Sequence, residues 1–403
     1  MTDVKLAYEK AKEILELCSS EHGFLASSVN KDNYKRVFSR DGVIIGLAAL
    51  LTGDKNHIET FKKTLKTLAD FQGEHGEIAS NIDVENKKVS FGRTVGRVDA
   101  TLWFVIGMGT YLKRTADNNF VKKHLSQIRK SVNLMGSWEF NQKGFIYVPQ
   151  GGDWADEYIN QGYVFYDELL YYKALESYLY IESKFGKKPD WVKPKIKNLR
   201  NMLNVNFWPE QKDMQSPDVY HDSLFHAILK RKESEYFVAS FTPGDYVKSF
   251  DSFANSLSIL LDCAEEDYVQ RIMVYVDKNF SKKTNYMIPS FYPIITKKHS
   301  EWSFLQANFS FKFKNKPYHY HNGGLWPLTT GFMIAAMVKA KRKDMAKKHM
   351  EALAKFVSVD DFGFYEYFDA EKFLPRGVKF LGFSAAGYII AYLSLYENKG
   401  VFF

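Results

Sequence analysis

Apolar and polar positions follow a helical period along nearly the whole chain of 403 residues. Apolar residues recur at positions i, i+3, i+4 and i+7, which predicts about twelve helices of two alternating kinds. One kind is apolar nearly all round, as in helices that pack on both sides, and comprises 43–51, 98–114, 163–181, 250–263, 325–340 and 382–395. The other kind carries charge on one face, which is typical of an outer helix, and comprises 4–17, 55–71, 117–137, 190–206, 265–279 and 342–356.

The connections between these helices are alternately short and long. The long ones run roughly over 20–40, 75–97, 140–162, 207–249, 280–324 and 358–381. If consecutive helices are antiparallel, every long connection emerges at the same end of the molecule. Helical hairpins closed in a ring then form an all-α (α/α)6 barrel of about twelve helices, with the long loops forming an active-site mouth. Loops this long are usually functional, whereas a stacked repeat array would keep a fixed period.

The chain is expected to form a single (α/α)6-barrel domain over residues 1–403, because no Pro/Gly/Ser-rich linker or low-complexity block divides it. A chain of this length buries enough surface to need no disulfide for stability. Its two cysteines, Cys18 and Cys263, lie in helical patterns and are interpreted as small core residues. Such sparse cysteine usage favours a reducing compartment.

Charge and hydropathy limit the partners. The N-terminal segment is charged and amphipathic rather than a signal peptide, and no run of about 18 apolar residues is present. We therefore predict a cytoplasmic protein without a membrane partner. The formal charge of +8 suggests nucleic acid, but the lysines fall on solvent-facing helix positions, as in 341–355, and no nucleic-acid-binding signature accompanies them. Pairing of outer helices leaves a homo-oligomer open, although no long heptad seam stands out.

Aromatic residues form 16% of the chain and are abundant in the long connections. Loops normally avoid large exposed rings, so these side chains either pack beneath the loops or line a pocket. Aromatic faces suit the apolar faces of sugar rings, which favours a small-molecule carbohydrate as the partner. The alternative is that the rings cap the barrel core.

Two Arg/Asp pairs enter inner helices from the mouth side. Arg40 and Asp41 lie in FSRDG, and Arg97 and Asp99 lie in GRVDATLWF, with Trp103 one turn further on. Each carboxylate has an ordinary explanation as a helix cap, because an acidic side chain there satisfies free N–H groups. In the functional interpretation, the charged pairs point into the mouth and hydrogen-bond sugar hydroxyls.

Three carboxylates crowd the third long connection, PQGGDWADEY, where Asp153, Asp156 and Glu157 flank Trp154. Like charges this close raise one another's pKa, and burial against the indole adds to that rise. A carboxyl held protonated near neutral pH is what a general acid requires. The alternative is a solvated acidic loop.

The fifth long connection ends in YHYHNGGLWPL, which contains His321, Asn322 and Trp326. Two histidines two residues apart suit a metal, but no further ligand cluster has the expected spacing, so no metal is predicted. The adjacent glycines allow the backbone to approach a ligand closely.

Glu366 lies among aromatic residues in FGFYEYFD, within the last long connection. A carboxylate in such a setting is costly unless it is used or paired, and Arg36, Arg93 and Arg376 are candidate partners. Two carboxylates on opposite sides of one mouth are the minimum apparatus for glycoside hydrolysis, which needs no cofactor. The chain lacks the motifs of serine hydrolases, P-loop proteins and dithiol redox proteins.

The order of these motifs resembles that of the neutral/alkaline invertase family and of related (α/α)6 glycosidases of the amylo-alpha-1,6-glucosidase type. The resemblance covers nearly the whole chain and rests on YKRVFSRD, RVDATLW, FDSFANSL, YHNGGLWP, YEYFD and FSAAGYIIAYL. It implies an inverting mechanism, with Asp156 as general acid, Asp153 as the runner-up, and Glu366 as general base. The glucosyl subsite implied by the match contains Arg40, Asp41, Asp99, His321 and Asn322. The remaining expected substrate-binding residues are Arg97, Trp103, Asp153, Trp154 and Trp326.

One departure concerns specificity. Plant and cyanobacterial members carry Asp-Arg-Arg where this chain has Asp156, Glu157 and Tyr158, which puts sucrose in doubt as the substrate. The leading hypothesis is an inverting hydrolase of an α-glucosidic bond in a small glucoside or oligosaccharide, either sucrose-type or α-1,6-linked. Its dry aromatic mouth is expected to hold Asp156 neutral and Glu366 ionised. The alternatives are a polysaccharide lyase and a non-catalytic carbohydrate-binding barrel.

Overall fold

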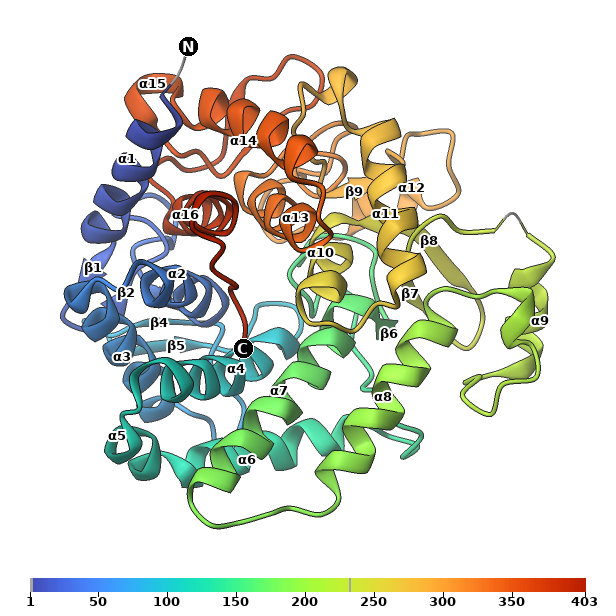
Figure 1. Ribbon diagram of the computed structural model, residues 1–403, viewed down its shortest axis with the longest axis horizontal. Helices are drawn as coiled ribbons and strands as arrows, with labels where there is room; N and C mark the ends of the chain where they lie inside the picture. The colour runs from blue at the N-terminus through green and yellow to red at the C-terminus, as the bar shows by residue number, and fades with distance from the viewer. Residues whose placement is uncertain (1–2, 232) are drawn as a thin grey trace.

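Six inner helices form a closed ring. The computed structural model describes residues 3–231 and 233–403. Each inner helix contacts the next, and the last contacts the first, as Figure 1 shows. This ring confirms the predicted all-α (α/α)6 barrel. Its members are α2 (Ser39–Thr52), α4 (Val98–Thr115), α7 (Phe165–Lys184), α10 (Ser252–Leu260), α13 (Pro327–Lys339) and α16 (Gly382–Glu397).

The outer layer follows the predicted alternation. The predicted helix over 117–137 is instead two helices, α5 (Asn118–Lys123) and α6, because the backbone of His124 leaves the helical region at φ −105° and ψ 13°. The outer helices are α1 (Val4–Leu17), α3 (Lys55–Asp70), α6 (Leu125–Ser137), α8 (Val192–Asn206), α11 (Glu266–Asn279) and α14 (Lys343–Val357).

Burial distinguishes the two layers. Every residue of α2 from Asp41 to Leu51 is buried, whereas α3 buries one face and exposes the other. A helix that is apolar all round removes its surface from water only when neighbours cover every side, and the inner ring provides this cover. Cys18 and Cys263 are both buried in the core, as predicted. No helix of the described residues is long and apolar enough to cross a membrane.

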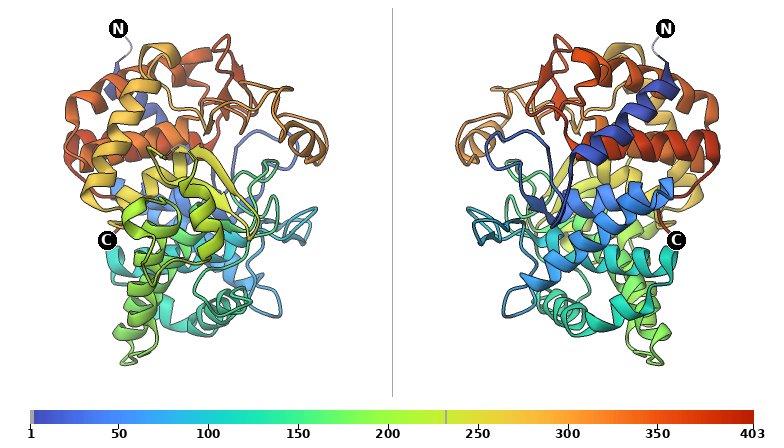
Figure 2. Two further views of the ribbon diagram at one scale, coloured as in Figure 1. Left: turned by 90° about the vertical axis from the view of Figure 1, so that its right-hand side faces the viewer. Right: turned by 90° about the vertical axis from the view of Figure 1, so that its left-hand side faces the viewer.

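The inner helices all begin at the same end of the barrel. Each follows a long connection, and Figure 2 shows these connections gathered on one side of the molecule, away from the short turns. The N-terminal ends of the inner helices therefore converge beneath the mouth. Because a helix N-terminus carries a partial positive charge, their convergence favours negative groups there.

The long connections fold further than the sequence pattern predicts. In the described residues they contain four small antiparallel sheets, and nine of the eleven strands have only two or three residues, too few for an alternating pattern to be recognised. The strands are β1 (Ser19–Ser20), β2 (Gly23–Phe24), β3 (Val37–Phe38), β4 (Asn81–Asp83), β5 (Lys88–Ser90), β6 (Tyr163–Val164), β7 (Val238–Phe241), β8 (Tyr246–Asp251), β9 (Phe291–Tyr292), β10 (Tyr367–Phe368) and β11 (Pro375–Arg376). The added helices are α9 (Asp222–Leu229), α12 (Trp302–Ala307), α15 (Val359–Phe362) and the 3₁₀ turns Gln211–Asp213 and Lys282–Thr284.

Two helices of the inner ring, α13 and α16, approach each other closely, and a substitution at their contact tests this packing. A Cβ atom on Gly331 of α13 would overlap the carbonyl oxygen of Gly387 in α16. Gly331→Ala is therefore expected to lower the free energy of unfolding by about 1–3 kcal/mol, because the two backbones must separate. Urea denaturation measures the change.

Gly136→Ala in α6 is the matched control, because a Cβ there meets nothing within 4 Å. Helix propensity alone predicts a gain of roughly 0.5–1 kcal/mol for this variant. Equal effects of the two substitutions on unfolding would contradict close packing of α13 against α16.

Candidate active site

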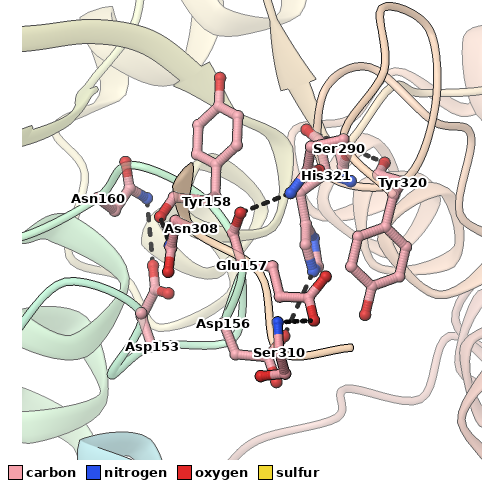
Figure 3. A network of polar contacts seen from close by, with 12 residues as sticks. Asp153, Asp156, Glu157, Tyr158, Asn160, Ser290, Asn308, Ser310, Tyr320 and His321 are labelled. Atoms are coloured by element: carbon pink, nitrogen blue, oxygen red, sulfur yellow. Dashed lines mark hydrogen bonds and ion pairs between the residues drawn. The ribbon is translucent and has the colours of Figure 1, made fainter. Parts of the chain in front are cut away.

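Asp156 lies at the mouth in an ion pair. Its Oδ2 accepts a hydrogen bond of 2.9 Å from Nη2 of Arg97, which precedes α4. Its Oδ1 lies 3.8 Å from Nε2 of His321, and Figure 3 shows the two side chains facing each other. The side chain of Asp156 is 29% exposed, whereas those of Arg97 and His321 are almost fully buried. Asp156 therefore presents a carboxylate to the mouth from a rigid support.

The protonation state of Asp156 differs from the expectation. Burial acts to raise its pKa, but the charge of Arg97 and the contact with His321 hold the pKa well below its usual value. Burial also lowers the pKa of His321 to about 4, so this imidazole is neutral near pH 7. The expectation that the mouth holds Asp156 neutral is wrong for the substrate-free protein. The sequence pattern showed three neighbouring acids but not the guanidinium that Arg97 places among them.

Glu366 faces the same mouth from the last long connection. Its Oε1 accepts a hydrogen bond of 2.7 Å from the Tyr34 hydroxyl, and its Oε2 accepts one of 3.3 Å from the backbone N–H of Val378. Burial raises its pKa, and the charge of Lys314 opposes this rise most strongly. Burial makes the largest contribution to the raised pKa of Tyr320, and the negative charges of Asp156 and then Glu366 raise it further. Both carboxylates therefore lie within electrostatic range of one phenol.

Among the described residues, Glu366 pairs with no arginine. Arg376 contacts Asp369, Arg36 contacts Asn81 and Asp83, and Arg93 donates to the Ser310 carbonyl. A salt bridge to an arginine therefore does not explain the position of Glu366 among aromatic residues.

The backbone beside Glu366 is shaped to admit its carboxylate. Gly377 has φ +77°, and a Cβ atom there would overlap Oε2 of Glu366. A side chain at position 377 would be strained and would displace the carboxylate. Gly377 thus positions Glu366, although no motif in the sequence marks it.

Arg40 begins a chain of hydrogen bonds that runs into the barrel. Its Nη1 donates to Oδ2 of Asp99 at 2.7 Å, and the Tyr166 hydroxyl donates to the same oxygen at 3.2 Å. Nε1 of Trp103 in turn donates to the Tyr166 hydroxyl at 2.7 Å. Trp103 is fully buried, with its ring near Phe402, so the structure places it in the support of the mouth rather than on its surface.

Neither Asp41 nor Asp99 is an N-cap. Phe38 precedes α2 and Arg97 precedes α4 in the N-cap positions, and neither of these side chains caps its helix. Asp41 lies in the first turn of α2 at 8% exposure, and burial raises its pKa to about 6. Both acids nevertheless lie in the first turn of their helices, where the positive end of the helix favours a negative side chain.

A second group of acids is buried beneath the mouth. Asp153 has no exposed surface, accepts a hydrogen bond of 3.1 Å from Asn160, and is turned away from Asp156 in Figure 3. Burial raises its pKa to about 7, with smaller contributions from Asp251 and Asp99. Asp153 is therefore protonated more readily than Asp156 but has no access to a ligand in the mouth.

Aromatic rings support His321. Its imidazole stacks on the Trp326 indole at 5.2 Å with 10° between the rings, and Trp154 meets it edge-on at 5.1 Å. Nε1 of Trp154 donates to Oδ2 of Asp251 at 3.0 Å. Trp154 and Trp326 are almost fully buried, so they hold His321 in place and offer little surface of their own.

Asn322 uses its amide to join loop segments. It donates to the carbonyls of Ile295 and Asn315, and it accepts from the Ile295 N–H at 2.8 Å. Its side chain has no exposed surface, so it holds the loop segments together and does not contact a ligand. Asp156, Arg40, Asp41, Arg97, Asp99, His321 and Glu366 are the expected site residues that the structure brings to the mouth or directly beneath it.

Several contributors were not singled out from the sequence. Tyr34 and Asp251 lie inside the motifs YKRVFSRD and FDSFANSL, so attention to hydrogen-bonding side chains beside the charged pairs would have found them. Tyr320 begins the motif YHNGGLWP and could have been found in the same way. Tyr166 and Lys314 lie outside the quoted motifs, and Tyr166 gains its role from a contact with Asp99 in a distant segment.

The barrel and its mouth of carboxylates define a glycoside hydrolase. The chain belongs to the alkaline and neutral invertase family, whose family model matches residues 7–227 and 217–397. The probable alkaline/neutral invertase F of Arabidopsis thaliana is 24% identical over 433 residues, covering 95% of this chain and 84% of the relative. Cytosolic invertase 1 of Oryza sativa subsp. japonica is 24% identical over 414 residues, covering 90% and 72%.

Solved structures share the fold. The mannosylglycerate hydrolase of Thermus thermophilus, in complex with Tris and D-glycerate, superposes with a TM-score of 0.67 at 11% identity and covers 95% of this chain and 99% of its own. A bacterial glucoamylase complexed with acarbose superposes with a TM-score of 0.68 at 17% identity, covering 98% of this chain and 56% of its own. Both likenesses support the double-layered barrel.

Asp251 offers a pH-dependent test of the buried acids. Burial raises its pKa to about 7, while an unfolded aspartate has a pKa of about 3.9. The neutral acid therefore contributes stability that is complete below about pH 4 and is lost as the pH rises through about 7. Between about pH 4 and 7, Asp251 is expected to lower the free energy of unfolding of the wild-type protein by about 1.4 kcal/mol per pH unit. Asp251→Asn stays neutral, so this part of the pH dependence should be absent in the variant.

Urea denaturation of both proteins at a series of pH values measures the two slopes. The amide oxygen that this substitution introduces can still accept from the N–H groups of Phe253 and Ala254, so the helix cap is kept. Parallel slopes for the two proteins would contradict a buried, neutral Asp251.

Proposed function

We propose that the protein is an inverting glycoside hydrolase that removes an α-linked glucosyl unit from a small glucoside or oligosaccharide. Asp156 is the general acid and Glu366 the general base. The observation that carries the proposal is the pair of carboxylates that approach one mouth from the third and last long connections. An inverting reaction requires such a pair, about 6.5–9.5 Å apart, with room for a water molecule.

The surroundings of Glu366 suit a base. Two donors, the Tyr34 hydroxyl and the Val378 N–H, contact its carboxylate, and both stabilise the ionised form. An ionised Glu366 takes a proton from the water that attacks the anomeric carbon. Asp156 gives a proton to the glycosidic oxygen as the bond to the leaving group breaks.

Asp156 must gain a proton when substrate binds. In the free protein Arg97 keeps it ionised, so the acid role requires substrate to displace Arg97 or to remove solvent from the carboxylate. The directions of the two pKa shifts favour a second assignment, in which Glu366 is the acid and Asp156 the base. The two assignments predict opposite results for a substrate whose leaving group needs no proton, because only the variant that lacks the acid stays active on it.

The remaining residues divide by position. Arg40 and Asp41 line the glucosyl subsite in this proposal, while Asp99 and His321 support Arg40 and Asp156 from beneath it and Arg97 adjusts the charge of Asp156. Trp103, Asp153, Trp154, Asn322 and Trp326 hold these groups in position from below. The reaction uses protein groups alone, without metal or cofactor. We also propose a cytoplasmic location, because relatives include a protein named cytosolic invertase, although other relatives are named chloroplastic.

Replacement of either carboxylate tests the pair. Asp156→Asn and Glu366→Gln are each expected to lower kcat by about 10²–10⁴-fold, because each removes a proton-transfer step. The assay is glucose release from sucrose, trehalose, maltose, isomaltose, panose and glucosylglycerol, with circular dichroism to verify folding. Glu157→Gln is the matched control, because Glu157 contacts the Ser310 N–H on the rim. Wild-type rates in either active-site variant would remove that residue from the mechanism.

α-Glucosyl fluoride decides between the two assignments. Fluoride leaves without protonation, so a variant that lacks the acid keeps much of its rate on this substrate, whereas a variant that lacks the base does not. If the primary proposal holds, Asp156→Asn hydrolyses the fluoride at a rate within about tenfold of the wild-type protein while Glu366→Gln stays inactive. Activity in Glu366→Gln and none in Asp156→Asn would establish the reversed assignment.

A further inference from the structure

Lys314 at the mouth has no acidic partner within ion-pair distance among the described residues. Arg97 is neutralised by Asp156, and Arg40 by Asp99. Lys314, by contrast, forms no ion pair with any carboxylate of residues 3–231 and 233–403. Its ammonium group lies 4.7 Å from the centre of the Tyr320 ring, and its side chain is exposed. The mouth therefore contains a positive charge that the described part of the chain does not use in a salt bridge.

The backbone that carries Lys314 is held firmly. The neighbouring Asn315 is fully buried and donates to the Glu157 carbonyl at 2.5 Å. Its Oδ1 accepts from the N–H groups of His321 and Asn322 at 3.0 and 3.2 Å. Asn315 thus ties this segment to both the Asp156 loop and the His321 loop, and Lys314 keeps a defined place beside them.

The charge of Lys314 reaches the reacting groups. After burial, it is the strongest influence on the pKa of Glu366 and of Glu157, and in both cases it favours the ionised form. It also acts on His321. Lys314 is therefore near Glu366, one of the two candidate catalytic carboxylates, and unlike Glu366 its side chain is exposed.

The charged side chains at the bottom of the mouth indicate which part of a bound substrate lies next to Lys314. Arg40, Asp41 and Asp99 lie in or beside the first turns of α2 and α4, at the bottom of the mouth. A glucosyl ring bound there leaves the other half of the substrate, the aglycone, toward the exposed rim. The rim segment 308–320 contains Lys312, Lys314 and Lys316 and no acidic residue.

We propose that Lys314 binds a carboxylate on the aglycone, so that the preferred substrates are α-glucosides of small hydroxy acids rather than neutral glucosides. This inference rests on the proposed hydrolysis of α-glucosides and specifies its substrate class. A single ammonium group matches one negative charge. A dianionic phosphate is less suitable, because Asp156 and Glu366 would repel its second charge.

A pair of isosteric substrates tests the proposal: 2-O-α-glucosyl lactate and the corresponding lactamide, which differ in charge but hardly in shape. The wild-type protein is expected to show a kcat/KM about two- to fivefold higher for the carboxylate, the size of one exposed ion pair. Lys314→Gln is expected to lose this preference, so that its kcat/KM falls more for the carboxylate than for the lactamide; any loss that comes from the effect of Lys314 on Glu366 is shared by both substrates. The preference of the wild-type protein should also shrink in 0.5 M salt, because the contact is exposed.

Lys312→Gln is the matched control. It removes the same charge two residues away on the same exposed segment. It should keep the preference for the carboxylate, which separates a specific contact from the general positive charge of the rim.

Other results would overturn the proposal. Equal kcat/KM values for the two substrates in the wild-type protein would do so, as would a preference that survives in Lys314→Gln. An equal loss on both substrates in Lys314→Gln would show that the lysine serves Glu366 instead. If no glucoside, including the fluoride, is hydrolysed, the proposed function fails. Ligand-detected NMR of lactate and lactamide binding to wild-type and Lys314→Gln protein then decides the role of Lys314 separately.

Discussion

Closure of the inner ring between α16 and α2 is the constraint on which the rest of the structure depends. Because each inner helix follows a long connection on the same side of the molecule, the helices of the closed ring all start at one end, and residues in their first turns meet there. Asp41, Asp99 and Asp167 occupy first turns, and Asp251 caps α10. The positive ends of the helices offset part of the cost of gathering these acids. The mouth is therefore acidic because of its architecture.

The cost of burying so many acids is met in different ways across the site. Asp99 and Asp156 each have an arginine, whereas Asp153 and Asp251 have raised pKa values and hydrogen bonds from neutral donors. Glu366 accepts from a phenol and a backbone N–H. The pKa of Asp156 is therefore lowered, whereas those of Asp153, Asp251 and Glu366 are raised, and such a separation of pKa values is the condition that acid–base catalysis requires.

The two layers and the position of the mouth were predictable, because helical periodicity and connection length are local properties of the sequence. The short strands were not, since two or three residues carry no recognisable period. The state of Asp156 was also beyond a local pattern, because Arg97 lies 59 residues away in the chain. Tyr34, the partner of Glu366, is separated from it by 332 residues. Motifs thus indicated which residues gather at the mouth, whereas their charges depended on contacts that only the folded chain contains.

The central claim is that a water molecule, activated by one carboxylate, attacks the sugar from the face opposite the leaving group. The most direct test is real-time proton NMR of the anomeric signals as the purified protein hydrolyses an α-glucoside. Inversion predicts that β-glucose appears first and that α-glucose grows in later by mutarotation. Initial release of α-glucose would contradict inversion and would require a covalent glucosyl intermediate.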